Sequence, residues 1–218
     1  MYLKIGLSGN RYSGKSRVCK IFNQVGIPVF EADVILKFIL LHNYELQSLV
    51  ADKIGRKYFN NGVLDYDKVI NGKVFSDILS IVEKDLFDAW ERFQKKNYKS
   101  IYCIFHSSML FERGWDKEMD KNISVFAPYS DRIDRCKFLT NESVSKIYSL
   151  TKSEMDELKK NSLSDFVIHN YNEDSVFGDI LTQVNRVDKS IIDNYLKGKM
   201  TKKIDVKVLN KLNPWSIY

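Results

Sequence analysis

The octapeptide at residues 9–16 constrains this chain more than any other segment. It reads Gly-Asn-Arg-Tyr-Ser-Gly-Lys-Ser and follows an apolar run at residues 2–7, which predicts a buried strand. The apolar residues after it recur at helical spacing: Val18, Ile21, Phe22 and Val25. Strand, glycine-containing loop and helix are the context that a phosphate-binding loop requires. The sequence therefore predicts an α/β protein that binds a nucleoside triphosphate.

Each residue type in this loop suits a polyphosphate. Gly9 and Gly14 allow backbone conformations that other residues resist, so main-chain N–H groups can approach the phosphates closely. Lys15 is expected to reach the β- and γ-phosphates, and the Ser16 hydroxyl to bind Mg²⁺. We predict that ATP contacts the following residues: Gly9, Asn10, Arg11, Tyr12, Ser13, Gly14, Lys15, Ser16 and Arg17. The alternative is a chance match, which average residue usage gives in roughly one chain in a hundred of this length.

Composition favours an intracellular protein with one core. A chain of 218 residues can fill one α/β core and has room for a small appended subdomain. Its longest apolar stretch is interrupted by Lys37, so no membrane span is expected, and the N-terminus reads as a strand and not as a signal peptide. The three cysteines are widely spaced, and neither they nor the three histidines show metal-ligand spacing. We therefore expect a cytoplasmic protein without a membrane partner.

The positive charge is concentrated near the C-terminus. The net charge is +6, and residues 190–218 hold two aspartates and six lysines: Lys197, Lys199, Lys202, Lys203, Lys207 and Lys211. Such a segment can hold nucleic acid or an acidic partner electrostatically, or it can be a solvated terminal helix. We expect a domain boundary near Lys189, which divides a core at residues 1–189 from a basic tail at residues 190–218.

Strand and helix patterns alternate along the core. Strands are expected at residues 26–30, 100–105, 122–126 and 165–168, and helices at residues 34–41, 44–54 and 73–96. This alternation predicts a parallel sheet covered on both faces. Ligands bind such a sheet at the carboxyl ends of its strands, where the loop at Gly9, Asp33 and the segment after Phe105 would lie.

The order of several short segments resembles the dephospho-coenzyme A kinase family. The resemblance covers roughly residues 1–185, and it rests on residues 5–9, 13–16, 26–29, 32–33, 110–112 and 164–170. It implies a three-layer P-loop kinase fold with a central parallel sheet, a helical substrate subdomain at about residues 34–98 and a short lid at about residues 129–160. It also implies ATP and Mg²⁺ as co-substrates and a small nucleotide-like acceptor, with dephospho-coenzyme A as the family default.

The same resemblance assigns roles to individual residues. Asp33 falls on the catalytic aspartate, which would accept the proton of the acceptor hydroxyl and lie near the metal; the alternative is a cap of the helix that follows. Arg132 and Arg135 match the start of the lid arginines and would stack on adenine or meet the triphosphate; the alternative is an exposed helix face. Asn170 matches the neighbourhood of the adenine ring, or it is a turn asparagine. Glu112 matches an acid near the metal, or it is a surface glutamate.

Several departures from the family concern chemistry. The loop of the family is richer in glycine than residues 9–12, so Arg11 adds a positive charge. His106 stands where the family has an acid, and Ser108 where it has a proline. Tyr66 replaces an arginine, and Glu154 replaces a glutamine. A second lid arginine has no counterpart other than Lys137 or Lys146. These changes leave the ATP side largely intact and alter the acceptor side.

Three functions are therefore open. The first is a kinase of a small nucleotide-like acceptor, and the second is a divergent (deoxy)nucleoside monophosphate kinase, of which virus-encoded enzymes are one form. The third is a nucleic-acid-associated P-loop protein that docks through the lysine-rich tail. Because most aromatic residues fall at core spacing and not on an exposed basic stripe, nucleic acid is the less favoured partner.

Overall fold

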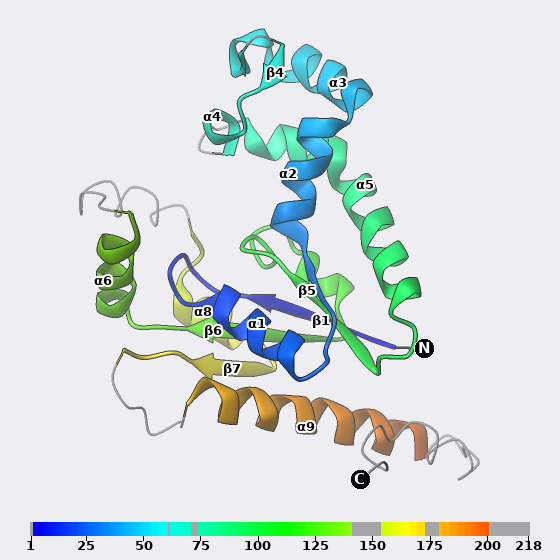
Figure 1. The fold of residues 1–218 in the computed structure, drawn as a ribbon, viewed down its shortest axis with the longest axis vertical. Coiled ribbons are helices and arrows are strands. Elements are labelled where there is room, and N and C mark those ends of the chain that lie inside the picture. The colour runs from blue at the N-terminus through cyan, green and yellow to red at the C-terminus, as the bar shows by residue number, and fades with distance from the viewer. Residues whose placement is uncertain (1, 61, 71–73, 141–153, 173–178, 201–218) are drawn as a thin grey trace.

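The fold is built on a parallel sheet, as the alternation of elements predicts (Figure 1). The computed structural model describes residues 2–60, 62–70, 74–140, 154–172 and 179–200. Within these residues five strands pair in the order β2-β5-β1-β6-β7, and every pair is parallel. The strands are β1 (Leu3–Ser8), β2 (Val29–Glu31), β5 (Tyr102–His106), β6 (Lys121–Phe126) and β7 (Phe166–His169).

Helices connect these strands and cover the sheet. They are α1 (Lys15–Gln24), α2 (Ala32–His42), α3 (Tyr44–Ile54), α4 (Tyr66–Ile70), α5 (Phe75–Lys96), α6 (Tyr129–Thr140), α8 (Glu157–Ser162) and α9 (Ile180–Met200). Two 3-10 turns, η1 (Arg56–Tyr58) and η2 (Trp115–Glu118), and a hairpin of β3 (Phe59–Asn60) with β4 (Val63–Leu64) complete the described elements. Among the described helices, none has the length and hydrophobicity that crossing a bilayer requires.

The side-chain alternation of β5, an inner strand between β2 and β1, contributes to a core on each face of the sheet. In β5, Tyr102 and Ile104 join the cluster formed with α1 and α9, whereas Cys103 and Phe105 join the cluster formed with α2 and α5. Both faces of β5 are covered, so every residue of this strand is buried, the polar His106 included. The result is the three-layer arrangement that the sequence predicts.

A helical projection rises from one face of the sheet (Figure 1). It consists of α2 to α5 with the β3–β4 hairpin, and it coincides with the segment expected to be the substrate subdomain. Its apolar residues continue the cluster of the sheet, from Phe105 through Leu86 and Val82 to Val50 and Leu64. The projection and that face of the sheet therefore share one core, while its role as a substrate subdomain stays a prediction.

The boundary expected near Lys189 does not coincide with the end of an element. α9 continues through this position to Met200, because its apolar stripe continues: Val184, Val187 and Ile191 all pack in the cluster with β7 and α1. Much of the expected lid, including Lys146, and the tail beyond Met200 lie outside the described residues.

One strand is shorter at its start than predicted. β2 begins at Val29 and not at residue 26, because Gly26 adopts a φ of 87° and Pro28 has no N–H group for a ladder. The same chain segment then passes directly from Glu31 into α2, which places Asp33 in the first turn of that helix and not ahead of it.

Candidate active site

The loop between β1 and α1 has the geometry of an anion-binding turn. Gly14 has a φ of 93°, and a Cβ atom at this position would lie 2.0 Å from Nδ2 of Asn170. At Gly9 a Cβ atom would lie 2.4 Å from the carbonyl oxygen of Val125. Only glycine fits at either position. α1 begins at Gly14 without a side-chain cap, so a bound anion can accept from the N–H groups of its first turn.

Lys15 lies over this loop in a strongly charged setting. Its Nζ donates to the carbonyl oxygen of Asn10 at 2.9 Å. Burial and, after it, the charge of Lys160 lower the pKa of Lys15 to about 8, although the carboxylates of Asp33 and Glu154 oppose the shift. The ammonium group is thus poorly compensated by the protein, which is the condition under which a polyphosphate is held tightly.

Asp33 is fixed by the segment that follows β5. Its Oδ1 accepts a hydrogen bond from Ser107 Oγ at 2.8 Å, and its Oδ2 accepts from the N–H and the Oγ of Ser108 at 3.0 and 2.7 Å. The cap position of α2 is Glu31, without a side-chain cap, so the capping role weighed for Asp33 is wrong. Because proline has no N–H group, the serine at position 108 adds a donor that the proline of the family pattern lacks.

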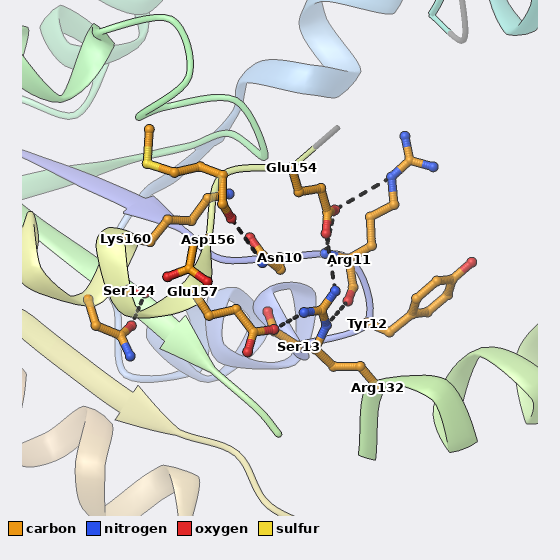
Figure 2. Close-up of polar contacts among 12 residues, drawn as sticks. Asn10, Arg11, Tyr12, Ser13, Ser124, Arg132, Glu154, Asp156, Glu157 and Lys160 are labelled. Carbon is orange, nitrogen blue, oxygen red and sulfur yellow. Dashed lines mark hydrogen bonds and ion pairs between the residues drawn. The ribbon is translucent and has the colours of Figure 1, made fainter. Parts of the chain in front are cut away.

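Arg132 joins the loop to residues 154–157, near the end of the expected lid (Figure 2). Its Nε donates to the carbonyl oxygen of Arg11 at 2.8 Å, its Nη2 to Oε2 of Glu154 at 3.1 Å, and its Nη1 pairs with Glu157. Oε1 of Glu154 also accepts from the backbone N–H of Arg11 at 2.8 Å. With 3 % of its surface exposed, Arg132 does not lie on an exposed helix face, and burial lowers its pKa.

Arg135 and Asn170 hold the other side of the loop. Nη1 of Arg135 donates to the carbonyl oxygens of Tyr12 and Ser13 at 3.2 and 3.3 Å, and Nη2 donates to the carbonyl oxygen of Asn170 at 2.8 Å. Nδ2 of Asn170 donates to the carbonyl oxygen of Ser13 at 2.7 Å. Asn170 is buried and therefore does more than form a turn: it ties the phosphate-binding loop to the end of β7.

An apolar hollow of about 410 Å³ opens beside the loop. Its lining is Tyr12, Gly14, Lys15, Ser16, Arg135, Phe138 and Leu139. Phe138 and Leu139 are 88 % and 68 % exposed, although both are large apolar side chains at the end of α6. An exposed apolar pair beside an anion-binding turn marks a candidate site for an apolar or aromatic group of a ligand.

The family pattern has an acid at two further positions, 106 and 112, and the side chain present at each of them has a partner. Glu112 lies 2.7 Å from Nζ of Lys160, which is 1 % exposed, and it also accepts from the N–H of Met155. His106, which stands where an acid is expected, has its Nδ1 2.8 Å from Oε2 of Glu31, and this hydrogen bond lowers the pKa of Glu31.

The structure brings most of the predicted residues to one edge of the sheet. Ser16 and Arg17 are exposed in the first turn of α1, and Ser16 lines the hollow. Sequence reasoning did not identify Ser107, Glu157, Phe138 and Leu139 as parts of this site. The exposed apolar pair in an otherwise polar helix was the one signal for Phe138 and Leu139, whereas Ser107 and Glu157 carried none.

Comparison with known proteins agrees with this geometry. A family model described as dephospho-CoA kinase matches residues 3–175. The dephospho-CoA kinase of Clostridium tetani is 25% identical over 182 residues, which cover 78% of this chain and 79% of that protein.

Solved structures share the fold. A crystal structure from Thermus thermophilus, titled TT1252, has a TM-score of 0.73 at 20% identity and covers 88% of this chain and 97% of its own. A dephospho-CoA kinase from Campylobacter jejuni has a TM-score of 0.54 at 18% identity, with coverages of 87% and 97%.

Proposed function

This chain belongs to the dephospho-CoA kinase family and is an ATP-dependent kinase, and from this premise we propose that it phosphorylates a hydroxyl group of a small nucleotide-like acceptor. Dephospho-CoA is the proposed acceptor. The observation that carries the proposal is the glycine turn with Lys15 over it, at the same edge of the sheet where Ser107 and Ser108 fix the Asp33 carboxylate.

The donor is proposed to bind along the loop and the apolar hollow. Its triphosphate accepts from the N–H groups at the start of α1, and Lys15 turns from the Asn10 carbonyl to the β- and γ-phosphates. Its base lies in the hollow against Phe138 and Leu139, with the Arg135 guanidinium beside it. Arg132 keeps the loop in shape through the Arg11 carbonyl and does not touch the nucleotide.

Asp33 is proposed to act on the acceptor. Three hydrogen bonds from Ser107 and Ser108 fix its carboxylate at the carboxyl end of β5, where an acceptor hydroxyl can donate to it. As the γ-phosphoryl group leaves ADP and bonds to the acceptor oxygen, the hydroxyl proton passes to Asp33. Positioning and charge neutralisation supply the rest of the catalysis.

The side chains at this edge fit Mg²⁺. The Ser16 hydroxyl and the Asp33 carboxylate are the hard oxygen donors that this ion prefers. We propose that Ser16 and Asp33 hold it. When bound, the ion offsets the charge of the phosphate oxygens.

The residues on the acceptor side make nucleoside monophosphates a second class of acceptor to test. At the position of the missing arginine, Nζ of Lys37 lies 5.1 Å from the ring centre of Tyr66, so a cation is still present there. His106 and Ser108 replace an acid and a proline beside Asp33. A deoxynucleoside monophosphate offers the same pair of groups as dephospho-CoA, a sugar hydroxyl and an anionic phosphate group.

The test is ADP release by the full chain with ATP, Mg²⁺ and each acceptor in turn. We expect dephospho-CoA to give the highest kcat/KM; preference for a nucleoside monophosphate would replace the acceptor and keep the kinase. Lys15→Ala should abolish turnover. Asp33→Asn should leave the Kd for ATP within about threefold and lower kcat by about 10²-fold or more. An unchanged kcat in Asp33→Asn would remove Asp33 from the mechanism.

A further inference from the structure

Three side chains that the proposed transfer does not use meet beneath the phosphate-binding loop. Cys19 comes from α1, Glu31 from the end of β2 and His106 from the end of β5, where the strand register pairs Glu31 with His106. One sulfur, one carboxylate oxygen and one ring nitrogen of this set all lie within 4.8 Å of one another. Among the residues that the structure describes, this is the one such group of cysteine, histidine and acidic side chains.

His106 is incompletely satisfied in this cluster. Its side chain is 7 % exposed, its Nδ1 lies 2.8 Å from Oε2 of Glu31, and its buried Nε2 has no hydrogen-bond partner. A buried polar atom without a partner is unfavourable, because the hydrogen bonds that it made to water are not replaced. Cys19 is 1 % exposed, so neither side chain is positioned to interact with bulk solvent. Nε2 of His106 is therefore available to a ligand that the described residues do not supply.

We propose that Cys19, Glu31 and His106 bind a Zn²⁺ ion. Sulfur, nitrogen and oxygen ligands together suit this borderline-soft ion, whereas Mg²⁺ prefers the oxygen donors of Ser16 and Asp33. Zinc bonds of about 2.0–2.3 Å in a tetrahedron put ligand atoms about 3.3–3.8 Å apart. The His106 Nδ1 to Glu31 Oε2 separation of 2.8 Å is shorter than that value and all three ligand atoms lie within 4.8 Å of one another, so side-chain rotations are needed to seat the ion. Three protein ligands leave the fourth position to water.

The site makes binding dependent on pH. Burial holds the pKa of the Cys19 thiol far above its usual range, and the nearby Glu31 carboxylate raises it further, whereas the charge of Lys15 acts in the opposite direction. Zinc binds the thiolate, so binding releases the thiol proton and tightens as the pH rises. Of the charged groups around the cluster, Asp33 acts on Glu31 and raises its pKa, and His106 lowers it.

The experiment uses the full chain, freed of metal and without nucleotide, titrated with Co²⁺ as a spectroscopic substitute for Zn²⁺. We expect about one Co²⁺ per chain, a thiolate-to-cobalt charge-transfer absorption, its displacement by Zn²⁺, and an affinity at least tenfold higher at pH 8 than at pH 6. Cys19→Ser should abolish the absorption, and His106→Gln should weaken binding at least tenfold. Cys136→Ser, which alters another buried cysteine outside the cluster, should leave both the absorption and the affinity for Co²⁺ unchanged.

Two results would overturn the proposal: no thiolate absorption in the unaltered chain, or an absorption that persists in Cys19→Ser. Circular dichroism and thermal unfolding of each variant separate loss of the site from loss of the fold. His106→Asp, which restores the acid of the family pattern, provides a second test, because it replaces the neutral ring nitrogen with a negatively charged oxygen ligand. We expect it to retain the fold and to shift the preference from Zn²⁺ towards harder ions.

Discussion

At the scale of single residues, Lys15 links the proposed donor site to the electrostatics of the protein. Its pKa of about 8 arises from burial and from Lys160, and the phosphates of a bound nucleotide should raise it. Near pH 8 binding of ATP should therefore take up about half a proton per chain. Isothermal calorimetry in two buffers of different ionisation enthalpy measures this uptake. At pH 6.5 the uptake should vanish, and heats independent of buffer at pH 8 would contradict the assignment.

The same shift has a consequence for stability with a definite sign. The unfolded chain holds the Lys15 proton up to the ordinary pKa of 10.5, whereas the folded chain releases it near pH 8. Between these values the unfolded state binds more protons, so this group makes the folded protein more stable as the pH rises. Below pH 8 both states are charged, and the full penalty for burying the ammonium group applies.

Ser108 supplies two of the three hydrogen bonds that hold Asp33. Ser108→Ala removes the one from the hydroxyl group, which is worth about 1 kcal/mol. We expect kcat to fall by about threefold to tenfold, with the KM for ATP unchanged, because Ser108 does not line the base hollow. Steady-state kinetics measures both constants. Ser80→Ala, on the exposed face of α5, is the matched control, and equal kcat values in the two variants would show that Ser108 does not position Asp33.

Some residue roles follow from the sequence and others do not. The motif alone predicts the roles of Gly14 and Lys15, because both act within one short loop between neighbouring elements of the chain. The contacts of Arg132 depend on Glu154 and Glu157, which are brought to it by the tertiary fold. Local sequence therefore predicts a lid arginine but not that its guanidinium is already paired.

At the scale of elements, Glu154 connects the segment before α8 to the loop and to α6. Glu154→Gln keeps the shape of the side chain, restores the family residue and removes a negative charge that acts on Lys15. We expect the Kd for ATP to fall about threefold to tenfold, because the carboxylate no longer repels the triphosphate. We also expect the free energy of unfolding to fall by about 1–3 kcal/mol, because Arg132 keeps only one charged partner.

Calorimetry and chemical denaturation measure these two effects. Glu157→Gln is the matched variant, since Glu157 also pairs with Arg132 but makes no contact with Arg11 in the described part of the chain. It should lower stability without tightening ATP binding. An ATP affinity that is unchanged by Glu154→Gln would mean that this carboxylate lies away from the phosphates.

The elements themselves were largely predictable. α3 extends over the expected residues, and β5 begins two residues later than expected because its register with β1 is fixed from Tyr102. Strand and helix periodicities are strong signals where one or both faces are buried. The start of β2 and the place of Asp33 inside α2 could not be predicted, because they depend on the Gly26 turn and on how β2 pairs with β5.

At the scale of the whole molecule, α9 determines where the chain can be shortened. A chain that ends at Ser190 loses Ile191, which is 2 % exposed in the core, and the partly buried Ile192. We expect its free energy of unfolding to fall by about 2–5 kcal/mol, which lowers Tm by about 5–15 °C. A chain that ends at Met200 should unfold at the temperature of the full chain. Differential scanning calorimetry of the three chains checks this, and equal Tm values would refute a structural role for residues 191–200.

The fold class was predictable and the cluster of Cys19, Glu31 and His106 was not. Alternating strand and helix patterns restrict the chain to a covered parallel sheet. The three candidate zinc ligands are separated along the chain by other elements, and they meet only because β2 and β5 are neighbours and α1 crosses above them. No spacing rule for metal ligands could have detected them.

The apolar cluster that joins the helical projection to the sheet has a consequence for how such a kinase can change its acceptor. Since Phe105 at the base and Val50 and Leu64 at the tip belong to one packed body, the projection cannot be re-angled without opening that interior. New acceptor preferences must then arise by exchanging side chains on an unchanged scaffold. Under the proposed function, a laboratory attempt to redirect the enzyme should begin with Tyr66 and Ser108, which differ from the family pattern, instead of grafting helices.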